Sequence, residues 1–166
     1  METPSYAIDG PVIFLDVDGV IATPKQIHAY AQTHGGQCPP GLAQIDMECM
    51  KRLKSICVRT TAMVVLSSTW RKIDHDLADL MKACSLFSIP VVGMTPVIPY
   101  GERGAEIQQF CTEHDIYRSM IVVLDDDGAD LTKVKDRLIR TDGYSGLSDA
   151  DVETACRLIG ERQLKQ

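Results

Sequence analysis

The chain has 166 residues, of which 45% are hydrophobic and 24% charged, an ordinary composition for a single globular domain. Because 17 lysines and arginines face 23 aspartates and glutamates, the formal net charge of −6 gives no general attraction for nucleic acid. These features exclude a disordered tail, a collagen-like rod and a disulfide miniprotein, and no apolar run approaches the roughly 18 residues of a membrane helix.

In chain order the expected elements are a strand at 11–15, a loop at 23–41, a helix at 42–58, a strand at 62–66, a helix from about 74 to 84, a strand at 90–92, a helix at 102–115, a strand at 120–124, a weaker strand at 138–140 and a helix at 148–159. Ser148 is expected to cap the last helix. This alternation of strands and helices predicts an α/β fold with a mainly parallel sheet and right-handed crossovers.

The cysteines and the N-terminus bear on the compartment. Six cysteines are present without a Cys-x-x-Cys pair, which disfavours a zinc ribbon or a redox motif. Most of them fall among apolar residues of predicted helices, where cysteine packs as a small hydrophobe. Met1 to Gly10 lacks the basic start and apolar core of a signal peptide. We therefore expect a cytoplasmic protein with no membrane association.

Polar clusters follow three of the predicted strands. The first strand ends in Asp16-Val17-Asp18-Gly19, the second in Ser67-Ser68-Thr69-Trp70-Arg71 and the fourth in Asp125-Asp126-Asp127. Parallel sheets bind ligands beyond the carboxyl ends of their strands. Gathered carboxylates repel one another unless a cation binds them, and Mg²⁺ prefers oxygen ligands. The acidic strand ends together predict a Mg²⁺ site, although each alone also fits an ordinary polar turn.

Taken in order, these motifs resemble those of the haloacid dehalogenase superfamily of phosphohydrolases. Asp16-Val17-Asp18-Gly19 is similar to the first motif, Ser67 to the second, Arg103 to the basic third and Asp125-Asp126 to the acidic fourth. The match runs from position 12 to about 127, most of the chain. The resemblance implies a three-layer α/β/α, Rossmann-like fold with a five-stranded, mainly parallel sheet and no large cap domain. Residues 1–166 would form one domain, with 22–41 as a flap or minimal cap loop.

A finer likeness comes from two segments. Ser67-Ser68-Thr69-Trp70-Arg71 and Arg103-Gly104-Ala105-Glu106-Ile107 resemble a subgroup that includes domains associated with RNA repair. The resemblance extends, more distantly, to the phosphatase half of polynucleotide kinase-phosphatase.

The resemblance also implies roles for the acidic residues. Asp16 would be the nucleophile that forms an aspartyl-phosphate, and Asp18 would be the general acid and base. The implied Mg²⁺ ligands are Asp16, Asp18 (through its main chain), Asp125 and Asp126, and the residues alone leave Asp127 and Asp130 open as substitutes.

Four residues are candidates for binding the substrate phosphate. Ser67 would hydrogen-bond a phosphoryl oxygen, and Ser68 is open for the same role. Arg103 would offset the charge that develops on the transferring phosphoryl group. Arg71 could clamp a backbone phosphate of the substrate. Trp70 is interpreted either as a packing anchor or as a platform on which a base stacks.

The segments between the motifs are filled by predicted helices and strands, which leaves no room for a large lid. An open site suits a phosphorylated macromolecule, such as a nucleic-acid end or a phosphoprotein, and a small phosphate ester stays open as a substrate. We therefore expect a magnesium-dependent phosphomonoester phosphatase. The alternatives are a nucleic-acid end-repair phosphatase, a phosphotransferase, or a non-catalytic module that binds Mg²⁺ and phosphate. The sequence leaves the oligomeric state open.

Overall fold

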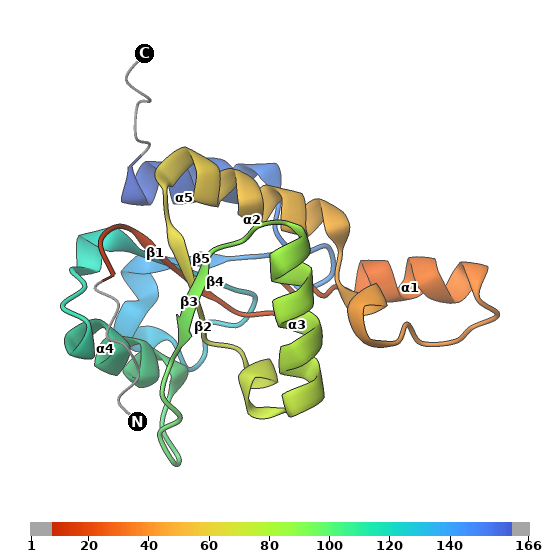
Figure 1. The fold of residues 1–166 in the computed structure, drawn as a ribbon, viewed down its shortest axis with the longest axis horizontal. Coiled ribbons are helices and arrows are strands. Elements are labelled where there is room, and N and C mark those ends of the chain that lie inside the picture. The colour runs from red at the N-terminus through yellow and green to blue at the C-terminus, as the bar shows by residue number, and fades with distance from the viewer. Residues whose placement is uncertain (1–7, 161–166) are drawn as a thin grey trace.

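The computed structural model describes residues 8–160, so most of the Met1 to Gly10 stretch lies outside the described residues. Within them, one sheet contains β1 (Val12–Leu15), β2 (Met63–Leu66), β3 (Val91–Met94), β4 (Ile121–Asp125) and β5 (Leu138–Arg140). Its order is β3-β2-β1-β4-β5, and every neighbouring pair is parallel (Figure 1). The predicted five-stranded parallel sheet is confirmed. The strand order reverses direction at β1, the position at which such sheets bind ligands.

Helices cover both faces of the sheet, as the three-layer prediction requires. Figure 1 shows α2 (Met47–Thr60) and α5 (Asp149–Ile159) side by side on one side of the sheet and α4 (Arg103–Glu113) on the other. The buried side chains of α3 (Asp74–Leu86) join the same apolar cluster as those of α2 and α5. The second cluster packs α4 against the opposite face.

The central strand β1 shows why the sheet is buried on both faces. Its side chains alternate, with Ile13 and Leu15 in the cluster under α2 and α5, and Val12 and Phe14 in the cluster under α4. All four are fully buried. Phe14 also meets Phe110 of α4 edge to face, with ring centroids 5.8 Å apart. A strand buried on both sides reads as a continuous apolar run, which is the pattern in the sequence.

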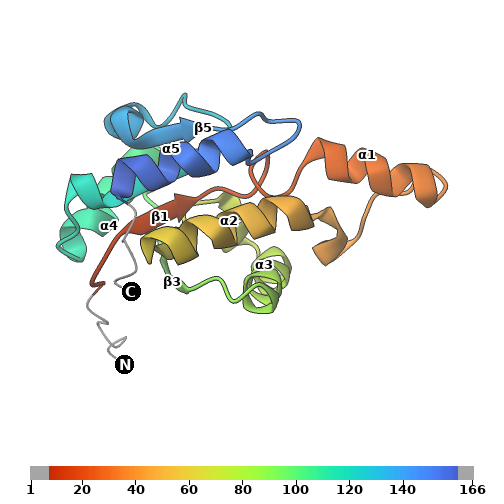
Figure 2. The same ribbon diagram turned by 90° about the horizontal axis from the view of Figure 1, so that it is seen from above.

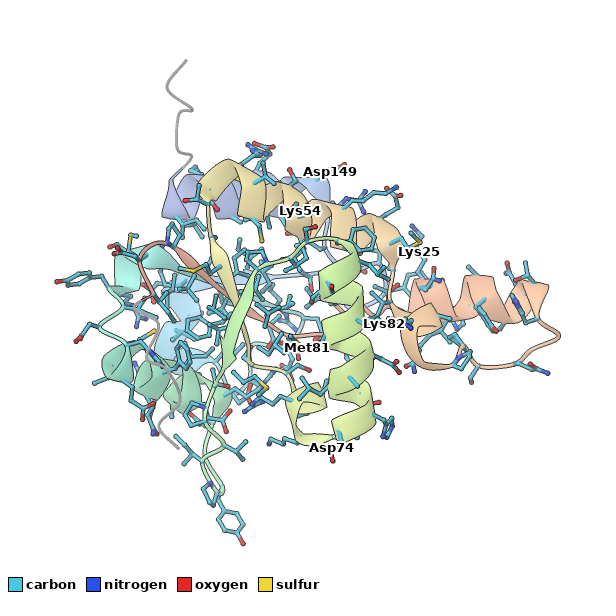
Figure 3. The ribbon with its side chains drawn as sticks, in the orientation of Figure 1. Lys25, Lys54, Asp74, Met81, Lys82 and Asp149 are labelled. Carbon is cyan, nitrogen blue, oxygen red and sulfur yellow. The ribbon has the colours of Figure 1, made fainter. Side chains whose placement is uncertain are left out.

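The segment 22–41, expected to be a loop, contains a helix instead, α1 (Pro24–Thr33). The Thr23 hydroxyl accepts a hydrogen bond from the Gln26 N–H at 3.1 Å, and Pro24 occupies the first turn, so a capping residue followed by proline starts the helix. No residue of α1 is buried, and the helix projects from the body of the molecule (Figures 1 and 2). Its base is tied down where Lys25 (Figure 3) donates its N–H to the Tyr144 carbonyl at 3.1 Å.

Capping residues decide two other helix starts. Helix α2 begins at Met47 rather than near residue 42, because the Asp46 carboxylate accepts from the N–H groups of Glu48 and Cys49. The predicted cap of α5 is confirmed, since the Ser148 hydroxyl accepts from the Asp151 N–H in a capping box. In the part of the chain that the structure describes, none of the helices has the length and apolarity needed to cross a membrane.

Candidate active site

The register of the sheet brings three strand ends to one level. Leu15 of β1 pairs with Leu66 of β2 on one side and with Leu124 of β4 on the other. The Asp16 N–H donates to the Leu124 carbonyl and the Ser67 N–H donates to the Leu15 carbonyl, both at 3.0 Å. The polar residues that follow β1, β2 and β4 therefore lie along one edge of the sheet.

An acidic cluster lies at this edge. Asp16, Asp125 and Asp126 each offer a carboxylate oxygen, and these oxygens lie within 4.8 Å of one another. Asp125 is fully buried and Asp16 is 7% exposed, whereas Asp126 is partly exposed. The side chain of Asp18 does not belong to this set. Three carboxylates so close together need opposite charge nearby.

Arg103, at the start of α4, supplies part of that charge. Its Nη1 donates to the Asp125 carboxylate at 2.6 Å and lies 3.5 Å from the nearer Asp16 oxygen. Its Nε donates to Asp130 at 2.9 Å. The guanidinium of Arg103, the basic residue that the sequence predicted, thus reaches the strand ends of both β1 and β4 from the α4 face of the sheet.

The two acidic residues that the sequence left as substitutes lie outside the cluster. Asp130 is engaged with Arg103, as described above. Asp127 is exposed and its carboxylate accepts from the Ala129 N–H, while its own N–H donates to Asp125 at 2.9 Å. Asp127 therefore orients a member of the cluster through its main chain.

The acidic groups have shifted proton affinities. Burial raises the pKa of Asp16, and the Arg103 charge opposes this shift. Neighbouring protein atoms that displace water from one side of Asp18 also raise its pKa, although the residue is exposed, and a hydrogen bond from Trp70 opposes this shift. Burial, reinforced by the charge of Asp16, raises the pKa of Asp125 to about 7. Carboxyls with raised pKa values hold protons more readily than ordinary ones, which suits groups that exchange protons or release them when a cation binds.

Gly19 lets Asp126 approach the turn after β1. The backbone of Gly19 has a φ of +72°, and a Cβ at this position would lie 2.4 Å from the Asp126 carboxyl carbon. A Cβ at Gly143 would lie 2.8 Å from a carboxylate oxygen of Asp126. Both glycines leave space for this carboxylate, so a larger residue would displace it.

The two serines after β2 differ in their bonding. Among the described residues, the Ser67 hydroxyl is the one buried side-chain polar atom without a hydrogen-bond partner. The Ser68 hydroxyl accepts from the Trp70 N–H at 3.3 Å and stabilises the charged form of Asp16, lowering its pKa. A buried hydroxyl rarely lacks a partner, so Ser67 offers a hydrogen bond to a ligand at the strand ends.

Trp70 contacts the site in a way that the sequence did not indicate. Its indole N–H donates to the Asp18 carboxylate at 3.0 Å. Trp70 as a residue is 7% exposed and belongs to the apolar cluster, so packing is one of its roles, as one of the two interpretations proposed. The arrangement leaves no exposed ring face for a base to stack on. No local sequence signal pairs residues 52 positions apart.

Arg71 does not point to a substrate. Its guanidinium donates to the carbonyls of Ser67, Ser68, Thr95 and Pro96 and to the Glu106 carboxylate, at 2.6 Å for the last. Its side chain is 2% exposed. Since all five N–H groups of arginine have acceptors, the structure does not support the expected phosphate clamp. Arg71 instead fixes the turn that carries both serines.

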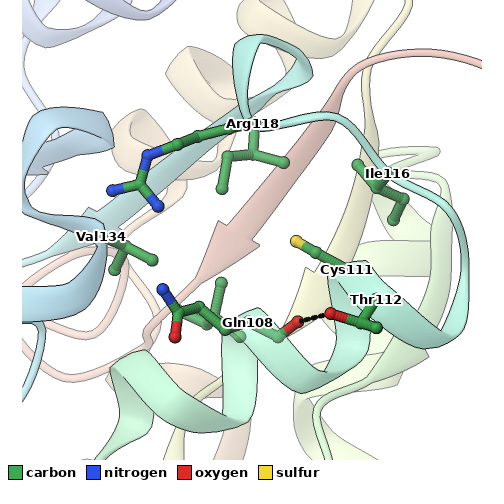
Figure 4. Close-up of a pocket in the computed structure, with 8 residues that line it drawn as sticks. Gln108, Cys111, Thr112, Ile116, Arg118 and Val134 are labelled. Atoms are coloured by element: carbon green, nitrogen blue, oxygen red, sulfur yellow. Dashed lines mark hydrogen bonds between the residues drawn. The ribbon is translucent and has the colours of Figure 1, made fainter.

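A cavity of about 260 Å³ lies away from this edge, between α4 and the start of β4 (Figure 4). Its lining includes Cys111, Ile116 and Arg118, and none of the predicted site residues contributes to it. The cavity therefore bears no relation to the acidic cluster.

The fold and the site together define a haloacid dehalogenase-type domain. The family model described as "HAD domain in Swiss Army Knife RNA repair proteins" matches residues 12–152, and the chain belongs to this family. A haloacid dehalogenase-like family hydrolase from Streptococcus pneumoniae shares the fold, with a TM-score of 0.50 and 12% sequence identity over 87% of this chain and 90% of that one. No curated protein sequence matches. Membership confirms the resemblance and supports a hydrolase.

The donor set fits the Mg²⁺ that members of this superfamily generally use. Asp16, Asp125 and Asp126 present only oxygen, the ligand atom that Mg²⁺ prefers. The space that Gly19 and Gly143 leave holds the Asp126 carboxylate beside the other two. These three side chains are the ones that would hold the cation, and Asp127 supports them through its N–H to Asp125.

Proposed function

We propose that the protein is a magnesium-dependent phosphomonoester phosphatase that works through an aspartyl-phosphate on Asp16. The observation that carries the proposal is the arrangement of Asp16 and Asp18. Asp16 is buried beside Arg103 as a member of the acidic cluster, whereas Asp18, two residues on, is exposed and lies outside the cluster. One carboxylate is held for attack and the other is free to exchange protons with a substrate.

The reaction has two steps. In the first, an Asp16 oxygen forms a bond to phosphorus, the bond from phosphorus to the leaving oxygen breaks, and Asp18 gives that oxygen its proton. In the second, a water oxygen attacks the same phosphorus, Asp18 takes the water proton, and the aspartyl bond breaks to release phosphate and free Asp16. Ser67 donates to a phosphoryl oxygen, and Arg103 offsets the developing negative charge.

Mg²⁺, when bound by the acidic cluster, neutralises the charge of the phosphoryl group and of the attacking carboxylate. The remaining contributions come from the chain itself. Arg71 fixes the serine turn, and Arg103 and Ser67 define the position of the phosphate.

For the substrate we propose the phosphorylated end of a nucleic acid. Two observations support this choice. The family description refers to RNA repair proteins. In addition, the one segment at the cap position, α1, projects outward without burying any residue, so nothing in the described residues forms a large lid. The net charge of −6 favours recognition of an end rather than tight binding along a strand.

The first experiment measures hydrolysis of an aryl phosphate with and without Mg²⁺. It compares the wild type with Asp16→Asn, using chelator as the metal control and Asp115→Asn as an acidic variant at an exposed position outside the site. We expect activity that disappears in Asp16→Asn and with chelator and persists in Asp115→Asn. Inorganic phosphate and the phenol should form in equal amounts, whereas a phosphotransferase would deliver the phosphoryl group to an added acceptor.

A substrate panel then tests the substrate class. It contains oligonucleotides with 5′ or 3′ phosphates, nucleotides, sugar phosphates and a phosphopeptide. The nucleic-acid proposal predicts the highest kcat/KM for an oligonucleotide end. Highest activity on a phosphopeptide or a sugar phosphate would refute it and leave the phosphatase chemistry intact. A folded wild type that binds Mg²⁺ and hydrolyses none of these compounds would favour the non-catalytic module.

A further inference from the structure

We propose that Trp70 is a positioning residue that orients Asp18 toward the leaving oxygen of the substrate. This inference rests on the proposed phosphatase function and concerns how the second aspartate is held. The indole N–H donates to one carboxylate oxygen of Asp18 at 3.0 Å. Among the described residues, Trp70 is the side chain that donates a hydrogen bond to this carboxylate.

Asp18 needs such a partner because of where it lies. Asp18 lies in the turn after β1, where the Gly19 N–H donates to the Ala22 carbonyl. Asp18 is exposed in this turn. An exposed aspartate side chain exchanges rapidly among its rotamers. A proton donor that acts on one atom must be held within a narrow range of positions. A fixed donor at one carboxylate oxygen restricts these rotamers and leaves the second oxygen for the substrate.

Trp70 is itself held firmly. The main-chain N–H of Trp70 donates to the Ser68 hydroxyl, and its main-chain carbonyl accepts from the Ile73 N–H. The guanidinium of Arg71 binds the carbonyls of Ser67 and Ser68, which fixes the turn that leads to Trp70. The ring is nearly buried in the main apolar cluster, and an indole has few rotamers, so the position of its N–H is set by packing.

The indole also restricts what this contact can do. Its nitrogen is a donor only and cannot accept a proton under these conditions. Trp70 therefore takes no part in proton transfer and acts only through the position of Asp18. The expected defect of a Trp70 variant is a loss of general-acid catalysis rather than a loss of nucleophilic attack.

The test compares esters with good and poor leaving groups. Departure of an alkyl alcohol needs a proton from Asp18, whereas departure of dinitrophenolate does not. The variant Trp70→Phe keeps an aromatic ring and removes the N–H. We expect kcat/KM for an alkyl phosphate to fall by about 10- to 100-fold, the range for a hydrogen bond to a charged group, and kcat/KM for dinitrophenyl phosphate to change by less than about 3-fold.

Two further variants complete the design. Thr69→Ala alters the same turn without touching the indole and should behave as wild type with both esters. In the background of Asp18→Asn, adding Trp70→Phe should lower activity by less than about 2-fold, because a residue that acts through Asp18 has nothing left to orient. Circular dichroism melting confirms that each variant is folded.

A second measurement needs no activity. Trp70 is the only tryptophan of the chain, so a ¹⁵N-labelled sample gives a single indole N–H signal. Asp18→Asn should move this signal, whereas Asp76→Asn, which changes a charge near Asp18 without a bond to the indole, should leave it nearly in place. An indole N–H signal whose position does not change in Asp18→Asn would refute the hydrogen bond between Trp70 and Asp18.

The outcomes separate the two proposals. An equal loss with both esters in Trp70→Phe, or no loss, would refute the positioning role while the wild-type activity upheld the phosphatase. A wild type without Asp16-dependent hydrolysis of either ester would refute the phosphatase proposal and this inference with it.

Discussion

Breaking the buried ion pair between Arg71 and Glu106 should destabilise the protein strongly. The two groups are 2.6 Å apart, and their side chains are 2% and 4% exposed. The second oxygen of Glu106 accepts from the Ile98 N–H at 3.0 Å. Removing one partner of a buried pair costs about 3–5 kcal/mol, because the other charge stays buried without compensation. We expect this loss for Glu106→Ala, and about half of it for Glu106→Gln, whose amide oxygen still accepts a hydrogen bond.

Removal of Arg71 should cost more than the loss of its charged partner. In Arg71→Met the carbonyls of Ser67 and Thr95 lose a donor in addition to Glu106, whereas the Ser68 carbonyl keeps the main-chain N–H of residue 71. Each buried acceptor left unsatisfied costs about 1–3 kcal/mol. The expected order of destabilisation is therefore Glu106→Gln, then Glu106→Ala, then Arg71→Met, with the last near or beyond the whole stability of a domain of this size.

Urea unfolding followed by circular dichroism measures these differences. The matched control is Glu113→Ala, which removes an exposed glutamate from the other end of the same helix. At about 2–4 °C per kcal/mol, Glu106→Ala should melt about 6–20 °C below wild type. A Glu106→Ala protein within about 1 kcal/mol of Glu113→Ala would refute the expected cost of leaving the Arg71 charge buried without its partner. An Arg71→Met protein more stable than Glu106→Gln would refute the argument from the carbonyls.

Three further predictions concern the acidic cluster. Replacing Arg103 by methionine should lower kcat by about 10²- to 10³-fold, with a smaller loss for lysine, in steady-state assays. Gly19→Ala should weaken Mg²⁺ binding in calorimetry, because the added Cβ displaces Asp126. The control is Gly35→Ala, which should leave Mg²⁺ binding unchanged, because Gly35 has a similar φ but open space around it. The raised pKa of Asp125, about 7, means that the folded state binds a proton more tightly than the unfolded state. Without Mg²⁺, stability should therefore fall as the pH rises from about 4 to 7 and level off above, and Asp125→Asn should flatten this slope in urea titrations.

The strands and their polar ends were predictable because the signals are local. A short run such as Val12–Leu15, apolar at every position, is typical of a strand covered on both faces, and its end is marked by the change to Asp16. Parallel pairing then requires that such ends share one edge. The grouping of Asp16, Ser67, Arg103 and Asp125 at one edge therefore follows from the order of the motifs, and the register of the sheet agrees with it.

The starts of two helices had local signals in the sequence that our predictions did not use. Thr23 followed by Pro24 is a helix start, yet the glycines and prolines farther along 22–41 favoured a loop. Asp46 as the cap of α2 was also readable. In both cases a local signal competed with the composition of a longer window, and the local hydrogen bond decided the structure.

By itself the sequence determined the fold class, the order of the motifs and the chemical types at the strand ends, since each depends on residues that are neighbours in the chain. Only the tertiary structure decided the partners of the polar side chains. Trp70 reaches Asp18 and Arg71 reaches Glu106 across long stretches of chain. A side chain with several hydrogen-bonding options takes the partner that packing brings within about 3 Å, and that distance exists only after the layers have assembled.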